Sequence, residues 1–388
     1  MSVIIENNNE VKHWFQYVEL SRYENILPDG TYYYIEINPG TQVDIKKKRH
    51  AADNVLGTNK ILLIDNMLEG LKTNIPFIYE EFVIKKNVPE EQIFLLSGAA
   101  DVKEFVEEYA LQFNRKPIQC KYVLFFANSL MNDVKYQRNY LIDRAFLDEK
   151  YRHRIFNHSR TYLNLNRRWR PHRVAMTAML YDKNLIDKGY VSLTDAGHGS
   201  NIESFNYDAI LDEHENDIES YVLLETQKSS LPLFTRMSLD RQSLVENEAH
   251  LSDDIEKYYW DSAINLTSET NFYTKSRLKH DDGRLFYEPA RFLSEKTFKP
   301  MLYLQPFIMI SVPKTLELLR NLGFKTFHPY INESYDDELN DGKRMMMIAD
   351  EVEKFCNYSK GEMANFLEVV KDRCFHNLYQ LDKITKIP

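Results

Sequence analysis

The twenty residues TYLNLNRRWRPHRVAMTAML, positions 161–180, contain the pattern on which the fold prediction rests. Residues 161–166 are a short apolar run typical of a buried strand, and residues 167–170 form a polar connection. Pro171 suits the first position of a helix, and the apolar residues that follow it support that helix. A further apolar run at 189–193 predicts the next strand. A strand, a crossover helix and a second strand are the unit of a parallel α/β sheet.

The same alternation recurs on both sides of this stretch. Strands are expected at 31–37, 60–65, 92–98 and 121–127, and again at 221–226, 264–272, 303–310 and 324–327. Helices are expected at 313–322, ending at Gly323, and at 360–381. We therefore predict an α/β protein with two Rossmann-like, doubly wound parallel-sheet domains facing a cleft. The expected boundaries are 1–157 and 158–360, followed by a C-terminal helix at 361–388.

Composition points to a globular protein with a substantial core. Of 388 residues, 43% are hydrophobic and 28% charged. The first residues lack the basic start and apolar core of a secretion signal, and no apolar run is long enough for a membrane span. The three cysteines, Cys120, Cys356 and Cys374, have no metal-type spacing. We expect a cytoplasmic protein, in the host cytoplasm if it is viral, with no membrane span, no metal and no bound cofactor.

Basic residues gather in one zone although the net charge is -9. Residues 150–173 contain no acid and eight basic residues: Lys150, Arg152, Arg154, Arg160, Arg167, Arg168, Arg170 and Arg173. The last four lie where a loop meets the start of the expected helix. Guanidinium groups there add to the amide donors of the helix and suit a diphosphate. We predict that these four arginines bind such an anion; an interdomain salt-bridge cluster or a solvated basic face is the alternative.

A second motif, FLSEKTFKP at 292–300, places a carboxylate beside an ammonium group ahead of the apolar run at 303–310. Glu295 could accept hydrogen bonds from ribose hydroxyls, and Lys296 could neutralise phosphate oxygens. With Gln305-Pro306-Phe307 and Gly323-Phe324-Lys325-Thr326-Phe327 after it, the motif resembles the donor-binding segment of GT-B-type glycosyltransferases. The resemblance is to the fucosyltransferases and to the glycosyltransferase-like proteins of phages and bacteria. In most of the C-terminal half the resemblance rests on specific motifs. In the N-terminal half it rests only on the pattern of alternating strands and helices.

The resemblance implies an enzyme that moves a sugar from a nucleotide sugar to an acceptor hydroxyl without a metal ion. The nucleotide sugar, a co-substrate, would lie in the C-terminal half on Glu269, Glu295, Lys296 and Thr297. Thr270 separates Glu269 from Asn271, whereas the family has a contiguous Glu-Asn segment. No Asp-x-Asp metal pair is expected, because the adjacent acids at 253–254, 281–282 and 336–337 suit turns and solvated loops.

Inverting transfer also requires a base that takes the proton of the acceptor hydroxyl. Asp65 ends an expected strand of the N-terminal domain and Glu69 follows it, and we predict that one of them is this base. Capping of a helix is the alternative for Asp65. Ser97 and Gly98 end the next strand and are expected to line the acceptor side.

The acceptor itself is predicted from charge. The zone at 150–173 and Lys46-Lys47-Lys48-Arg49 carry more positive charge than one diphosphate requires, which favours a hydroxymethylated pyrimidine in phage DNA. A glycan or a protein acceptor is the alternative within the enzyme class. A catalytically silent protein that binds sugar nucleotides or nucleic acid is the alternative outside it.

Overall fold

The computed structural model describes residues 3–6, 27–37, 42–67, 74–166, 170–193, 251, 253–274, 277–279, 285–287 and 290–386. The chain forms two compact units. The first contains Met1–Ser129, Ser276–Leu293 and Thr385–Pro388, and the second contains Leu130–Lys275 and Ser294–Ile384. The boundary expected at residue 157 falls inside the second unit, as does most of the expected C-terminal helix.

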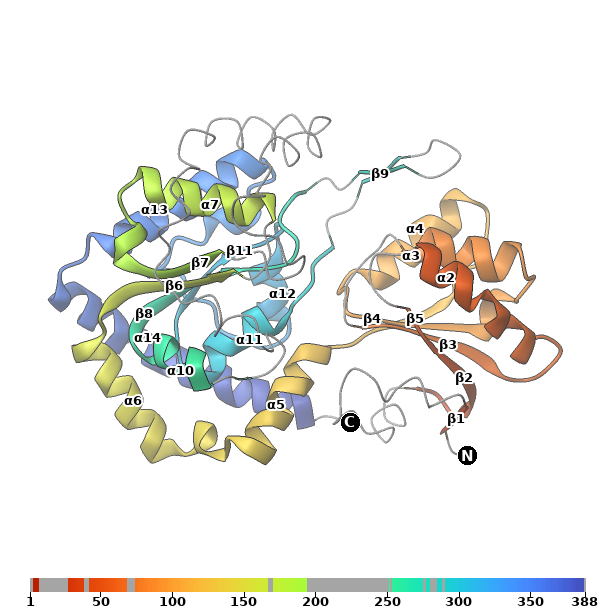
Figure 1. Cartoon of the computed structure of the whole chain (residues 1–388), viewed down its shortest axis with the longest axis horizontal. Coiled ribbons are helices and arrows are strands. Elements are labelled where there is room, and N and C mark those ends of the chain that lie inside the picture. The colour runs from red at the N-terminus through yellow and green to blue at the C-terminus, as the bar shows by residue number, and fades with distance from the viewer. Residues whose placement is uncertain are drawn as a thin grey trace. The chain divides into compact units, whose positions relative to one another are not determined.

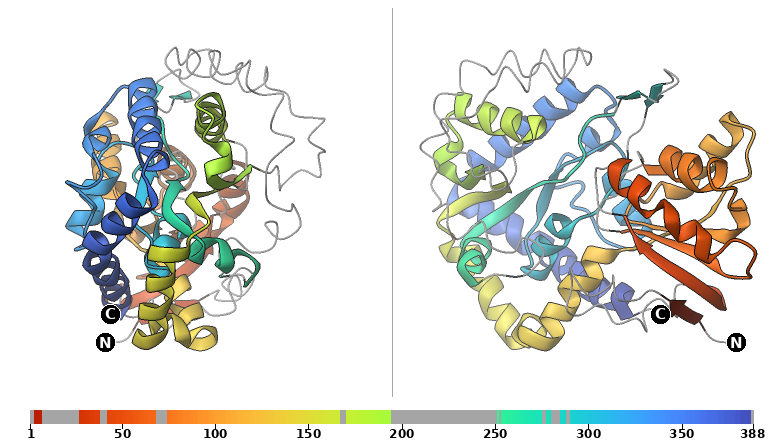
Figure 2. Two further views of the ribbon diagram at one scale, coloured as in Figure 1. Left: turned by 90° about the vertical axis from the view of Figure 1, so that its left-hand side faces the viewer. Right: turned by 45° about the vertical axis from the view of Figure 1, so that its right-hand side comes forward.

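The first unit contains a five-stranded parallel sheet with its strands in sequence order. These are β1 (Val3–Glu6), β2 (Gly30–Glu36), β3 (Ile61–Asn66), β4 (Ile93–Ser97) and β5 (Gln119–Tyr122). Helices α2 (Gln42–Lys48), α3 (Asn74–Ile78) and α4 (Val102–Gln112) lie in the connections and cover one face of the sheet (Figures 1 and 2). The antiparallel pair β9 (Arg277–Lys279) and β10 (Leu285–Tyr287) is also part of this unit.

One hydrophobic core explains this arrangement. Ile35, Ile64 and Leu95 stand side by side in the register of β2, β3 and β4, and they share a core with Ile45 of α2 and Val106 of α4. Right-handed crossovers that always step in the same direction must place their helices on the same face. The described strands therefore form a singly wound sheet, whereas a doubly wound one was expected from the sequence.

The predicted strand at 121–127 is only partly correct. β5 ends at Tyr122, and α5 (Phe125–Gln137) begins inside the same apolar run. Val123, Phe125 and Phe126 are all buried. A short apolar run that is buried throughout suits a strand and the first turn of a buried helix equally well, so its period does not distinguish them.

The second unit contains a four-stranded parallel sheet in the order β11-β8-β6-β7. The strands are β6 (Arg160–Asn166), β7 (Gly189–Leu193), β8 (Ser262–Ser268) and β11 (Phe307–Ile310). Helices α7 (Pro171–Asp182) and α13 (Asp341–Cys356) pack on one face; α6 (Arg144–Asn157), α10 (Asp253–Trp260) and α11 (Glu295–Leu302) pack on the other (Figure 1). Helices α12 (Thr315–Asn321) and α14 (Lys360–Lys386) complete the unit. With helices on both faces and a reversal of strand order, this sheet has the doubly wound form.

A buried arginine of α6 joins several elements of the second unit. The guanidinium of Arg154 is 0% exposed and donates to four backbone carbonyls, those of Ser262 (3.0 Å), Tyr259 (3.0 Å), Tyr303 (2.7 Å) and Leu304 (2.7 Å). Burial lowers the pKa of Arg154 to about 10, which still leaves it charged at neutral pH. This member of the basic zone therefore holds α10, β8 and the end of α11 together and is not available to a ligand.

The predicted strand at 324–327 is irregular in the structure. Its backbone is bound by side chains instead of by a neighbouring strand. Asn377 of α14 accepts from the amide of Lys325 (2.7 Å) and donates to its carbonyl (2.8 Å). Buried polar backbone groups need partners from some source. Here an amide side chain provides both hydrogen bonds that a strand would have provided.

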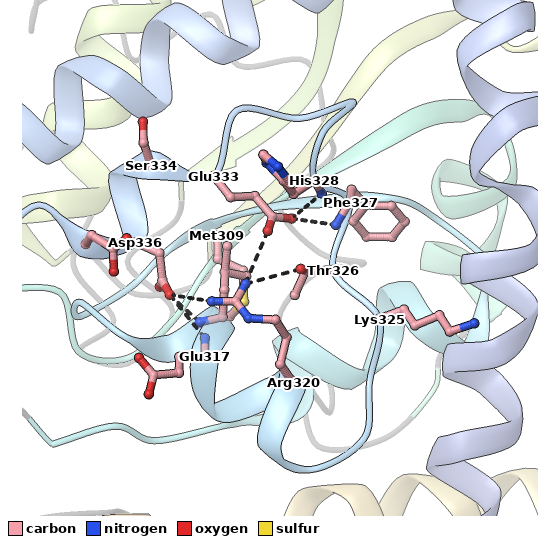
Figure 3. A network of polar contacts seen from close by, with 12 residues as sticks. Met309, Glu317, Arg320, Lys325, Thr326, Phe327, His328, Glu333, Ser334 and Asp336 are labelled. Carbon is pink, nitrogen blue, oxygen red and sulfur yellow. Dashed lines mark hydrogen bonds and ion pairs between the residues drawn. The ribbon is translucent and has the colours of Figure 1, made fainter.

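The segments on either side of α12 are held by two buried carboxylates (Figure 3). Glu333 accepts from the amides of Phe327 and His328 and is paired with Arg320 (3.3 Å). Asp336 accepts from the amides of Leu316 (2.9 Å) and Glu317 (3.1 Å), so it caps the first turn of α12. Asp336 is 3% exposed, so the expectation of a solvated pair at 336–337 is wrong for Asp336, whereas Asp337 is exposed.

Candidate functional site

The order of the second sheet reverses between β6 and β8. The chain leaves β6 for β7 on one side, and β8 then pairs with the other side of β6. In open α/β sheets, ligands bind at the carboxyl ends of the strands where the order reverses, because the connections there leave in opposite directions. β6 ends at Asn166 and β8 ends at Ser268. The arginine-rich stretch and Glu269, two features singled out from the sequence, directly follow these strand ends.

Glu269 is a buried carboxylate that organises the start of α11. One oxygen accepts from the amide of Ser294 (3.0 Å) and from the hydroxyl of Thr297. The other accepts from the hydroxyl of Ser294 (2.8 Å) and from the amide of Thr270 (3.1 Å). Four donors occupy the acceptor capacity of a carboxylate. Glu269 and Thr297, both predicted to bind the donor, therefore bind each other and position the helix that carries the Glu-Lys pair.

Glu295 and Lys296 form the first turn of α11. Ser294 is the N-cap, and its hydroxyl accepts from the amide of Lys296 (3.3 Å). The Lys296 ammonium lies 2.6 Å from a carboxylate oxygen of Glu295. The Glu295 side chain is buried, whereas Lys296 retains 18% exposure. The dipole of the helix adds positive potential at its N-terminus.

Two lysines determine the ionisation of Glu295. Burial raises its pKa, but the charges of Lys296 and Lys299 and the hydrogen bond from Lys296 together outweigh burial, so the pKa lies below its ordinary value of 4.5. The carboxylate is consequently ionised at neutral pH. It can accept hydrogen bonds from a ligand but cannot act there as an acid.

The lowered pKa of Glu295 predicts a pH dependence of stability. The contribution of Glu295 should be complete above about pH 4.5, its ordinary pKa, and should be lost as the pH falls through the lower folded value. Urea denaturation between about pH 3 and pH 6 checks this. We expect the wild type to lose stability on acidification more steeply than Glu295→Gln. Parallel pH profiles would contradict the assignment.

The Glu-Lys pair lines a small pocket. Its walls come from β6, β7, β8, α10 and α11 and comprise Leu165, Asn166, Ser192, Ile255, Tyr259, Asn265, Leu266, Thr267, Ser268, Glu295, Lys296 and Lys299. The cavity volume is about 40 Å³. That is room for about three water molecules. The pocket therefore fits only one part of a nucleotide, such as a phosphate or a few sugar hydroxyls.

The start of α7 is fixed to the end of β8 by two residues of the arginine-rich stretch. Arg173 donates to the carbonyl of Glu269 (3.3 Å), and the His172 ring nitrogen lies 3.0 Å from the same oxygen. Both side chains are 2% exposed, and the His172 ring stacks on Phe272. Arg170, the N-cap of α7, is partly buried. Arg173 thus binds a backbone carbonyl at the end of β8, beside the pocket.

The described residues of the basic zone differ in burial. Arg154 and Arg173 are buried, whereas Arg152 and Arg160 are exposed on α6 and β6. Arg167 and Arg168, the other predicted anion-binding residues, lie outside the described residues. Of the eight basic residues, Arg154 and Arg173 are thus directed to backbone carbonyls inside the second unit.

The predicted catalytic carboxylate Asp65 is the penultimate residue of β3, and its oxygens accept hydrogen bonds from neighbouring groups. It accepts from the Tyr34 hydroxyl (2.9 Å) and from the amide of Met67 (3.0 Å), and it is 7% exposed. The second bond closes a turn at the end of the strand, and residues 68–73, which follow it, lie outside the described part of the chain. Glu69 lies outside the described part of the chain.

Ser97 and Gly98, expected on the acceptor side, have local structural roles. The Ser97 hydroxyl accepts from the amide of Ala99 (3.1 Å) and closes the turn after β4. A side chain at Gly98 would overlap the carbonyl of Met67 and the ring of Phe292. Close packing by itself therefore requires glycine at this position.

Several residues that line or support the pocket were not predicted as site residues. Ser192, Asn265 and Thr267 line the pocket from inside apolar strands, and Ser294 organises α11 through its cap. Two signals could have revealed them. Polar residues in otherwise apolar, buried strands need a partner or a ligand, and a serine directly before Glu-Lys is a typical N-cap.

Within the described ranges, no helix is long and apolar enough to cross a membrane, and no three His, Cys, Asp or Glu side chains group as metal ligands would. Comparisons with protein-family models, with curated proteins and with solved structures found no match to this chain.

Proposed function

We propose that this chain is a metal-independent glycosyltransferase of GT-B type whose second unit binds the nucleotide-sugar donor. One observation carries the proposal: the Glu295–Lys296 pair stands on the first turn of α11 and lines a pocket beside the reversal of strand order. The resemblance of the FLSEKTFKP segment to fucosyltransferase donor motifs adds support from the sequence. We also propose that the protein works in the cytoplasm.

The chemistry of the pocket suits a nucleoside diphosphate as leaving group. Sugar transfer builds negative charge on the departing diphosphate, and cations fixed in a partly buried site stabilise that charge. Lys296 and Lys299 supply two such cations, and the helix N-terminus adds to them. The ionised Glu295 can accept from ligand hydroxyls once Lys296 turns to a phosphate. The polar walls, Asn166, Ser192 and Thr267, provide further hydrogen-bonding groups.

Loss of the lysine tests this assignment. We expect Lys296→Ala to weaken binding of nucleoside diphosphates by about 1.5–3 kcal/mol, the scale of a hydrogen bond to a charged group. Calorimetric titration in excess chelator measures the effect and shows whether binding needs a metal ion. Lys188→Ala, which removes an exposed ammonium of the same unit before the start of β7, is the matched control and should leave affinity unchanged. Equal affinity of Lys296→Ala and wild type would remove Lys296 from the site.

The acceptor is proposed separately from the donor. Hydroxymethylated DNA, a glycan and a protein remain the three candidate acceptors, with the base contributed by the first unit. Incubation of the protein with labelled nucleotide sugars and each acceptor distinguishes them. Transfer to hydroxymethylated but not to unmodified DNA supports the DNA acceptor, and label on a glycan or protein alone excludes it.

A further inference from the structure

A short segment of the first unit leads directly into the Glu-Lys motif. Arg291 is bound by Asp101, whose carboxylate accepts from the Arg291 amide (2.9 Å), its Nε (2.7 Å) and its terminal nitrogen. The carbonyl of Arg291 accepts from the amide of Ala100 (2.9 Å), and Phe292 forms a β-bridge with Ala99. The Phe292 ring packs edge-to-face on Phe126. Residues 290–292 are thus anchored to the turn between β4 and α4.

The carboxylate of Asp101 does not make the hydrogen bond that its position in the chain would favour. Asp101 is the N-cap residue of α4, and aspartate at that position normally accepts from amides of its own helix. Its side chain makes no such bond. The carboxylate is 6% exposed and is directed to Arg291, 190 positions away in sequence. The Asp101 carboxylate therefore binds Arg291 in place of the amides of its own helix.

The next residues are anchored independently in the second unit. The chain passes between the units at Leu293 and Ser294. Ser294 is bound through its amide and its hydroxyl to Glu269. Leu293 is the one residue between the two anchors, and consecutive Cα atoms are about 3.8 Å apart. A link this short has almost no slack.

We propose that Asp101 and Arg291 are a positioning pair for the pocket in the second unit. By fixing residues 290–292 they hold Leu293, and through it the Ser294 cap and the Glu295–Lys296 turn, in the arrangement that binds a ligand. Pre-organisation of this kind improves affinity because less ordering is left for the binding step. The effect on ligand affinity rests on the proposed donor site, whereas the effect on the α11 turn does not.

Hydrogen exchange of the backbone amides tests the pair without any ligand. We expect Asp101→Asn and Arg291→Gln to accelerate exchange at Ser294, Lys296 and Thr297 by at least about tenfold, the signature of local opening. Arg291→Lys, which keeps the charge but has fewer donors, should lie between wild type and Arg291→Gln. Asp53→Asn removes an exposed ion pair to Lys86 in the same unit and should change nothing at α11.

The outcomes separate the inference from the proposed function. Acceleration confined to residues 290–293, or spread equally over β8, would overturn the positioning role. In the same samples we expect nucleoside diphosphate affinity to fall about three- to thirtyfold, which is about 0.7–2 kcal/mol. If the wild type binds no nucleoside diphosphate, the proposed function fails while the exchange data still decide the role of the pair.

Discussion

Replacement of Arg154 by methionine is expected to lower the free energy of unfolding of the second unit by about 3–5 kcal/mol. The guanidinium is fully buried and donates to four carbonyls that belong to α10, β8 and the connection after α11. Methionine fills similar space but donates nothing, so these carbonyls would lose their partner away from water. Urea or thermal denaturation followed by circular dichroism measures the change.

Arg152→Met is the control for this prediction. Arg152 lies on the same helix and is exposed. Its replacement removes the same charge, and we expect it to change stability by less than about 0.5 kcal/mol. If the two variants unfold alike, Arg154 is not the structural link that its hydrogen bonds indicate, and it would return to the group of candidate anion-binding residues.

Glu269→Gln is expected to cost about 2–4 kcal/mol in stability, because bonds to a charged acceptor contribute about 1.5–3 kcal/mol each and are not additive. Glutamine retains one acceptor oxygen, and its amide group would face donors that already point at it. Disorder of the first turn of α11 should follow, so ligand binding at Lys296 should weaken as well. Differential scanning calorimetry with and without a nucleoside diphosphate measures both effects.

Two further variants serve as comparisons for Glu269→Gln. Thr297→Val removes one of the four donors to Glu269 and should cost about 1 kcal/mol. Glu368→Gln, on the exposed side of α14, should have no effect. A Glu269→Gln protein as stable as wild type would mean that the carboxylate does not organise α11.

The elements of the second unit could largely be predicted from the sequence. The apolar run at 161–166, Pro171 and the run at 189–193 correspond to β6, the start of α7 and β7. Their local patterns and their tertiary environment agree. The pattern failed at 324–327, where the segment has strand-like residues but pairs with Asn377, a partner on a distant helix. No local pattern contains that information.

The winding of the sheets could not be predicted for a similar reason. Each strand–helix–strand unit looks alike in sequence, whether the next strand is added on one side of the sheet or on the other. The order of β1 to β5 and the reversal at β6 depend on pairing between distant strands. The domain boundary shows the same limit, because Arg291 joins the first unit through a carboxylate far away in the sequence.

At the candidate site, residue type was more predictable than residue role. The charged side chains after β8 and at the start of α11 do gather beside the reversal of strand order. Which of them face a ligand depends on pairing within the fold. Glu269 and Arg173 form hydrogen bonds within the protein, whereas Glu295 and Lys296 line the pocket. A sequence shows that a carboxylate is present but not whether its oxygens are already occupied.

A crystal structure of the protein with a nucleoside diphosphate, grown in excess chelator, tests the central claim most directly. The proposed donor site predicts that the diphosphate lies within hydrogen-bond distance of the Lys296 ammonium. It also predicts that the 2.6 Å pair between Lys296 and Glu295 is broken or lengthened. A nucleotide bound elsewhere, with Lys296 still paired to Glu295, would contradict the assignment of the donor site to the start of α11.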